Sequence, residues 1–317
     1  MLKRTLYFGH PTYLSLDNGQ LVIKFPEIEG DANSSEEFKT LSSKSIPIED
    51  IGVVVLDHQR ITITQGAMNA LIENRAALVT CDKKRMPIGL ILPLEGNTIQ
   101  CERIRQQLES SLPLRKQLWQ QTVKAKIENQ AAILAKYTNK PVTNLCVMAK
   151  NVRSADPDNF EAQAAVYYWK NFLVDQPDFV RSREGSPPNN LLNYGYAILR
   201  SVVARSLVIS GLLPVYGIHH HNKYNPYGLA DDIMEPYRPY VDMTVLDIVK
   251  KYGYQSELNV DSKKDLLCIP AMDVKINGKR RPLMIAVSET SSSLVKCFSG
   301  EARKISYPDA YDPSEIK

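Results

Sequence analysis

The segment Thr12-Tyr-Leu-Ser-Leu-Asp-Asn-Gly-Gln-Leu-Val-Ile-Lys-Phe25 sets the character of the first ninety residues. Its two short apolar runs lie on either side of Asn18-Gly19, the dipeptide favoured in type I′ turns, so it predicts a β-hairpin. Residues 51–56 form a β-branched apolar run typical of a buried strand, and residues 60–64 alternate with period two. These patterns predict a β-rich N-terminal domain.

From about residue 98 the apolar period becomes helical, beginning with Ile104 and Leu108. Further helices are expected over residues 160–174, 191–213 and 231–251, and a second Asn-Gly hairpin at 277–278 comes before a helix over 284–298. We therefore predict an α+β multidomain chain. Its parts would be a β-rich domain over residues 1–95, a larger, mainly α-helical domain over 96–305, and a disordered tail over 306–317.

The composition excludes several classes of protein. With 44% hydrophobic and 23% charged residues, the 317-residue chain is neither disordered nor collagen-like. It contains no apolar run of about 18 residues, so we expect no membrane association. Its five scattered cysteines argue against a disulfide framework or a thiolate zinc site and favour the cytoplasm. The sequence has no phosphate-binding loop, dinucleotide fingerprint or nucleophile elbow, which leaves catalysis by a metal without a nucleotide.

The residues best suited to bind a metal lie in the second half of the chain. The run His219-His220-His221 is followed by Asp231-Asp232 and Glu235, and on a helix Asp232 and Glu235 share a face. Imidazole and carboxylate ligands suit Mn²⁺ or Mg²⁺. A surface histidine turn and an acidic helix N-terminus would give the same pattern. Glu161 is a candidate for a third acid, with a first-turn glutamate as the alternative.

Cationic side chains surround this segment along the chain. Residues 101–159 hold ten basic and five acidic residues, which indicates either a phosphate-facing surface or ordinary solvated helix faces. Single cations near the candidate site would contact DNA phosphates without reading sequence. The candidates are Lys150, Arg153, Arg181, Arg183, Lys223 and Arg238.

Three segments carry a resemblance to a known family: residues 193–200 (NYGYAILR), 217–222 (GIHHHN) and 228–239 (GLADDIMEPYRP). They resemble the CRISPR-associated integrase of the adaptation module, and their sequences are most similar to its type II branch. The likeness extends from the first strand to about residue 300. It implies an N-terminal β-sandwich-like domain that dimerises and a helical, metal-dependent catalytic domain.

The resemblance also implies the metal site. Glu161, in its Glu-x-x-Ala-Ala setting, takes the place of the first acid. His220 takes that of the histidine because it lies fifteen residues before Glu235, which takes the place of the second acid. Asp232 matches an additional acid near the site. His219 or His221 would be the ligand if the turn were shifted.

The activity implied is spacer acquisition in antiviral defence. The 3′-hydroxyl of a short captured duplex would attack a phosphodiester at the edge of a CRISPR repeat, with Mg²⁺ or Mn²⁺ bound, and activity would fall in acid as His220 protonates. The partners implied are DNA, a second copy of the chain, the small ferredoxin-like second adaptation protein, and the CRISPR effector nuclease. Two alternatives remain: a metal-dependent nuclease that makes no joined product, and a non-catalytic DNA-binding scaffold.

Overall fold

The computed structural model describes residues 3–26, 43–138, 140–176, 178–254 and 257–309. The chain divides into two compact units, Met1–Gly96 and Asn97–Lys317. The first is built from strands and one described helix, whereas the second is mainly helical, so the α+β class is confirmed.

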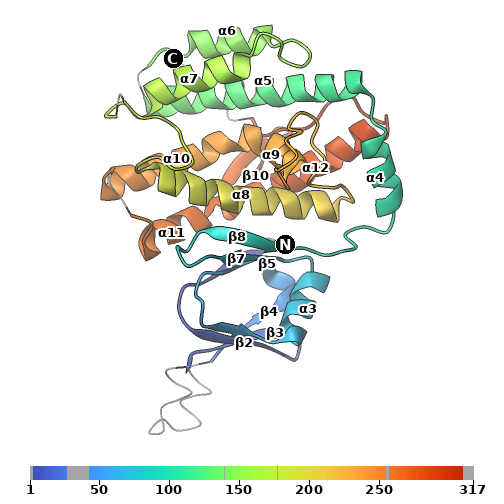
Figure 1. Ribbon diagram of the computed structural model, residues 1–317, viewed down its shortest axis with the longest axis vertical. Coiled ribbons are helices and arrows are strands. Elements are labelled where there is room, and N and C mark those ends of the chain that lie inside the picture. Colours follow the sequence, from blue (N-terminus) through green and yellow to red (C-terminus); the bar gives the residue numbers. More distant parts are fainter. Residues whose placement is uncertain (1–2, 27–42, 139, 177, 255–256, 310–317) are drawn as a thin grey trace. The chain divides into compact units, whose positions relative to one another are not determined.

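The first unit contains two four-stranded sheets, which Figure 1 shows in blue and cyan. One has the order β1 (Arg4–Phe8), β5 (Ile51–Leu56), β7 (Ala77–Cys81), β8 (Pro87–Ile91), with β8 antiparallel to its parallel neighbours. The other has the order β4 (Lys44–Pro47), β3 (Gln20–Lys24), β2 (Thr12–Asp17), β6 (Ile61–Ile63). Leu14, Leu21, Ile51 and Val54 pack with Leu71 of α3 (Gln65–Glu73), so both sheets and the helix share one apolar core.

Both predicted Asn-Gly hairpins are confirmed. Asn18 and Gly19 have φ of 47° and 72°, and β2 pairs with β3 across them. In the second unit Asn277 and Gly278, at 50° and 73°, join β9 (Asp273–Ile276) to β10 (Lys279–Pro282). Two successive residues with positive φ define the type I′ turn, which asparagine and glycine tolerate best.

The second unit is organised around α5 (Leu112–Tyr137), a helix of 26 residues. It packs against α6 (Thr143–Asn151) and α7 (Phe160–Phe172) on one side and against α10 (Arg238–Tyr252) on the other (Figure 1). The remaining helices are α4 (Gln100–Leu108), α8 (Asn189–Ile209), α9 (Gly228–Met234), α11 (Val260–Leu267) and α12 (Leu283–Phe298).

The single helix predicted over residues 231–251 is wrong. The chain forms α9, then a 3₁₀ turn at Glu235–Tyr237, and then α10. Pro236 and Pro239 cause the break because neither has an N–H to continue an α-helical ladder, whereas both fit first-turn positions. Glu235 therefore lies at a junction between helices and not in mid-helix.

The start of the predicted disordered tail is fixed to the second unit. Thr290 Oγ1 donates to the Ser306 carbonyl at 2.6 Å, the hydroxyls of Tyr307 and Thr122 are 2.8 Å apart, and the Asp309 amide donates to a main-chain carbonyl at 2.8 Å. The prediction of disorder is therefore wrong for residues 306–309, and residues 310–317 lie outside the described part of the chain. In the part that is described, no helix has the length and apolar character to cross a bilayer.

Candidate active site

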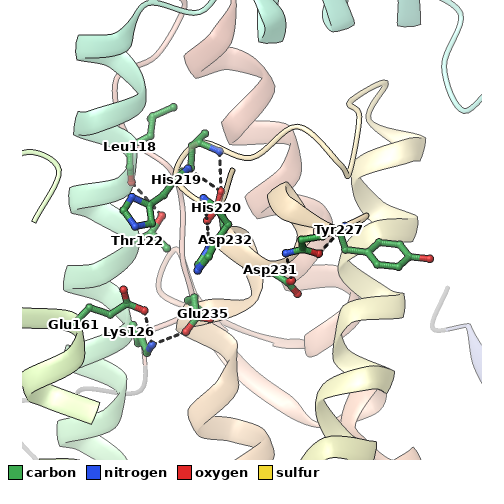
Figure 2. A network of polar contacts seen from close by, with 12 residues as sticks. Leu118, Thr122, Lys126, Glu161, His219, His220, Tyr227, Asp231, Asp232 and Glu235 are labelled. Atoms are coloured by element: carbon green, nitrogen blue, oxygen red, sulfur yellow. Dashed lines mark hydrogen bonds and ion pairs between the residues drawn. The ribbon is translucent and has the colours of Figure 1, made fainter. Parts of the chain in front are cut away.

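The predicted acids and histidine come from three elements of the second unit and lie together in Figure 2. Glu161 is in the first turn of α7, His220 is in the loop between α8 and α9, and Glu235 follows α9 directly. A fourth residue, Lys126 of α5, lies among them.

Lys126 joins the two glutamates. Its Nζ donates to Glu161 Oε1 at 2.8 Å and forms an ion pair with Glu235 Oε2 at 2.6 Å. The Lys126 side chain is 11% exposed, that of Glu161 23% and that of Glu235 6%, so all three charges are largely shielded from water. One ammonium group therefore brings carboxylates from α7 and from the α9–α10 junction to a common point.

The charges at this point stabilise one another. Burial would lower the pKa of Lys126, but the adjacent charges of Glu235 and Glu161 outweigh it and raise the pKa, so the amine is protonated. Burial would likewise raise the pKa of Glu235, yet Arg238 and Lys126 hold it well below its usual range. Arg238 Nε donates to Glu235 Oε1 at 2.7 Å. Glu235 is therefore an ionised carboxylate in a buried setting.

Asp232 fixes the position of His220. Its fully buried carboxylate accepts the main-chain N–H groups of Ile218, His219 and His220 at 2.7, 3.0 and 3.2 Å. His220 Nδ1 lies 2.5 Å from Asp232 Oδ1, and since both Asp232 oxygens accept main-chain N–H groups, Nδ1 is assigned as the donor. This hydrogen bond, strengthened by nearby negative charge, raises the pKa of His220.

The Asp232 carboxylate is placed to orient the His220 ring. Its oxygens already accept four hydrogen bonds from residues 218–220. With Nδ1 protonated, the lone pair of His220 is on Nε2, the arrangement found where a carboxylate supports a metal-binding histidine. Asp232 therefore contacts the site through His220, and its role as a possible metal ligand stays a prediction.

Two glycines allow this loop to fold so tightly. A Cβ on Gly217 would lie 2.6 Å from the His220 carbonyl oxygen and 2.7 Å from Asp232 Oδ2. A Cβ on Gly228 would lie 2.7 Å from the Val215 carbonyl oxygen and 2.8 Å from that of His220. No side chain fits at either position without displacing backbone or the buried carboxylate.

The other two histidines have different surroundings. The His219 ring stacks on Trp119 of α5 with centroids 4.0 Å apart, and burial lowers its pKa. His221 is exposed and its ring is 6.4 Å from that of Tyr216. Of the three, only His220 bonds Asp232 through its ring, and the charges of both glutamates help to raise its pKa.

The start of α7 positions Glu161. The Asp156 carboxylate accepts the main-chain N–H groups of Phe160 and Glu161, each at 2.9 Å. Ala155, Asp156 and Asn159 all have positive φ, of 69°, 51° and 54°. This left-handed turn, closed by Asp156, directs the first turn of α7 toward α5.

The predicted DNA-contacting cations are not alike. Arg238 is engaged with Glu235 and lies 4.5 Å from the Tyr196 ring centroid, and Arg181 bonds Asn189 and Asn193 at 2.8 and 2.7 Å. These two serve the protein's own structure. Arg153 pairs with Asp158 at the surface. Lys150, Arg183 and Lys223 are exposed, and Lys223 lies over the Tyr224 ring at 4.9 Å.

Sequence reasoning missed Lys126 and Trp119. Both occur on the stripe of α5 that also contains Val123, at helical spacing from one another. A lysine on an apolar stripe is a signal for a buried charge with a partner, because burying an unpaired ammonium is costly. The partners themselves, 35 and 109 positions along the chain, give no local signal.

The donor chemistry suits a hard divalent cation. Two carboxylates and an imidazole nitrogen are ligands that Mg²⁺ and Mn²⁺ accept, and the ammonium of Lys126 shows that the two glutamates already hold a cation. Across the described residues, no three His, Cys, Asp or Glu side chains form a group that could hold an ion, and Lys126 Nζ lies between the two acids.

Comparison with known proteins identifies the family. Residues 6–267 match the model of the family described as CRISPR associated protein Cas1. The chain belongs to the Cas1 family. It is 36% identical over 294 residues to the CRISPR-associated endonuclease Cas1 of Neisseria meningitidis serogroup C (strain 8013), covering 92% of this chain and 91% of that one. The resemblance predicted from the sequence is confirmed.

Solved structures share the fold of this Cas1-family chain. A casposase bound to integration product superposes with a TM-score of 0.76 at 19% identity, covering 100% of this chain and 96% of the casposase. A Cas1 protein from Thermotoga maritima gives 0.69 at 16% identity, with 94% and 97% covered. The Cas6-RT-Cas1–Cas2 complex gives 0.70 at 19% identity, with 95% of this chain and 35% of that one covered.

Proposed function

We propose that this Cas1-family chain is a metal-dependent DNA endonuclease and integrase that joins 3′-hydroxyl ends of short captured DNA to CRISPR repeats. One observation carries the proposal: Glu161 and Glu235 meet on one cation beside His220, whose ring is oriented by a buried aspartate. The endonuclease name of the Neisseria relative and the family match support it.

Glu161, Glu235 and His220 Nε2 would hold the Mg²⁺ or Mn²⁺. Once bound, such an ion supplies positive charge to the phosphate oxygens as charge accumulates in phosphoryl transfer. Asp232 holds the His220 ring in the tautomer that leaves Nε2 unprotonated. Arg238 holds Glu235 through Oε1 and so fixes the direction of that carboxylate.

The reaction is an exchange of phosphodiester bonds. The 3′-oxygen of the captured strand loses its proton and bonds to a repeat phosphorus, while the original 3′-oxygen of the repeat leaves and gains a proton. Because one phosphodiester forms as one breaks, no nucleotide is required, in agreement with the lack of nucleotide-binding motifs in the sequence.

The partners we propose follow from the reaction and the family. Integration at both ends of a repeat requires two such sites, and we propose a homodimer formed through the N-terminal unit, together with a Cas2 protein of the kind present in the Cas6-RT-Cas1–Cas2 complex. Exposed Lys150, Arg183 and Lys223 would contact DNA phosphates. The effector nuclease is a further proposed partner.

A strand-transfer assay tests the function. The protein and its Cas2 are mixed with a short 3′-hydroxyl duplex and a repeat-bearing plasmid, with Mn²⁺ or Mg²⁺ or with EDTA. Joined product that disappears with EDTA, with Glu161→Gln and with His220→Ala is expected, while His221→Ala, at an exposed neighbouring position, retains activity. Cleavage without joining would favour a nuclease, and DNA binding without either would favour a scaffold.

A further inference from the structure

Lys126 has no counterpart among the residues that the family resemblance assigned to the site. It is a buried cation on α5, and its Nζ lies 2.8 Å from Glu161 Oε1 and 2.6 Å from Glu235 Oε2. These are two of the three side chains that would hold the metal. Lys126 therefore binds the same carboxylates as the ion on which the proposed function rests.

The two cations compete for the same space. A Mg²⁺ or Mn²⁺ ion bonds carboxylate oxygens at about 2.1 Å. If it shared either glutamate oxygen with Lys126, the ion and the ammonium would lie within about 5 Å of each other, with little water to screen the repulsion of like charges.

Charge balance gives the same result. In the structure Lys126 and Arg238 neutralise Glu161 and Glu235 one for one. Arg238 reaches Glu235 through Oε1, whereas Lys126 contacts Glu235 through Oε2 and Glu161 through Oε1. A divalent ion placed between the acids would add two positive charges to this balanced set, and of the two resident cations it is Lys126 that contacts both acids.

We propose that Lys126 is a resident cation, which holds Glu161 and Glu235 together before metal binds and gives up this position when a divalent ion enters. The inference deepens the proposed function and depends on it. The flexible four-carbon stem of lysine lets the ammonium move while α5 stays in place. The two glutamates would then be held in place without metal, and the metal affinity would be lower because the ion has to displace Lys126.

The test compares Mn²⁺ binding, measured from the electron paramagnetic resonance signal of free Mn²⁺, in metal-free wild type and variants. Lys126→Gln is expected to bind Mn²⁺ about tenfold more tightly or better, because no ammonium competes. Lys126→Arg keeps a cation and should not gain affinity. Lys124→Gln is the matched control, since Lys124 is on the same helix, 51% exposed, and paired with Glu128.

Thermal unfolding gives a second measurement. Without metal, Lys126→Gln leaves two carboxylates facing each other and should unfold at a lower temperature than wild type. Mn²⁺ should restore much of the difference, so its stabilising shift is larger in the variant. A Lys126→Gln protein that folds neither with nor without Mn²⁺ would overturn the inference, because the ion would then be unable to replace the ammonium.

The outcomes separate the two proposals. If wild type binds Mn²⁺ in a manner abolished by His220→Ala, but Lys126→Gln binds it equally or more weakly, the resident-cation inference fails and the proposed function stands. If Mn²⁺ binding to wild type is absent or indifferent to both His220→Ala and Glu161→Gln, both proposals fail.

Discussion

Replacing Asp232 by asparagine, a side chain of nearly the same size, should disable the site. The Asp232 carboxylate accepts three main-chain N–H groups and the Nδ1–H of His220. An asparagine offers one accepting oxygen and one donating NH₂, so at least two of the four donors would face another donor. His220 can avoid facing a donor by changing tautomer, so that Nδ1 accepts a hydrogen bond and the proton is carried on Nε2, where the metal should bind.

The magnitude follows from these lost bonds. A buried donor without an acceptor costs about 1–3 kcal/mol, so Asp232→Asn should lower the free energy of unfolding by about 2–6 kcal/mol, or about half that if the ring changes tautomer. Loss of the supporting carboxylate should weaken metal binding about 10- to 100-fold.

The measurements are urea unfolding, Mn²⁺ binding and strand transfer on the same preparations. His221→Asn serves as the control because it introduces the same amide at an exposed position next to His220. An Asp232→Asn protein with wild-type Mn²⁺ affinity would refute the orienting role of Asp232. A variant of unchanged stability would refute the claim that its four hydrogen bonds anchor the loop.

Three further effects are expected elsewhere. Burial raises the pKa of Asp242 from its usual 3.8 to about 7, so the folded state favours the protonated form. The free energy of unfolding should therefore fall by up to about 4 kcal/mol as the pH rises from about 4 to 7. Asp242→Asn should abolish this pH dependence in unfolding measurements. Gly217→Ala should cost about 1–3 kcal/mol and weaken Mn²⁺ binding, because its Cβ would press on Asp232. Lys223→Ala should reduce DNA affinity and lower the salt slope of binding by about one.

Each of these effects has a matched control. Asp247→Asn, at an exposed position of α10, should leave the pH dependence of stability intact. Gly66→Ala, in α3, has no neighbour within 4 Å of the added Cβ and should stabilise the protein by up to about 1 kcal/mol. If Gly217→Ala changed the free energy of unfolding by the same amount as Gly66→Ala, the close packing at residue 217 would be refuted. DNA affinity unchanged by Lys223→Ala at every salt concentration would remove Lys223 from the proposed DNA surface.

Local signals explain what the sequence could predict. The hairpins follow from Asn-Gly dipeptides, which adopt positive φ at low cost wherever they occur. The relative placement of His220 and Glu235 could be predicted because both lie on one short stretch of chain. The break between α9 and α10 was also encoded locally, in Pro236 and Pro239, but the apolar period on either side concealed it.

Long-range contacts explain what could not be predicted. Lys126 meets Glu235 across 109 positions, and nothing in α5 specifies which acid its ammonium will find. The use of the Asp232 oxygens by the loop could not be foreseen either, because a main-chain N–H is the same for every residue and leaves no trace in the sequence. Such an acid looks the same as a metal ligand until its hydrogen bonds are known.

Gly217, His220 and Gly228 approach one another closely and so bring together the two ends of a short loop. Residues 221–224 between these ends are exposed, whereas the main-chain N–H and the ring of His220 are bonded to Asp232. The cost of closing a loop grows slowly with its length, so this segment should accept insertions or altered side chains readily. Descendants of this protein could thus exchange these exposed side chains while inheriting the Asp232–His220 hydrogen bond unchanged, and an engineer could place a fluorophore at the same point.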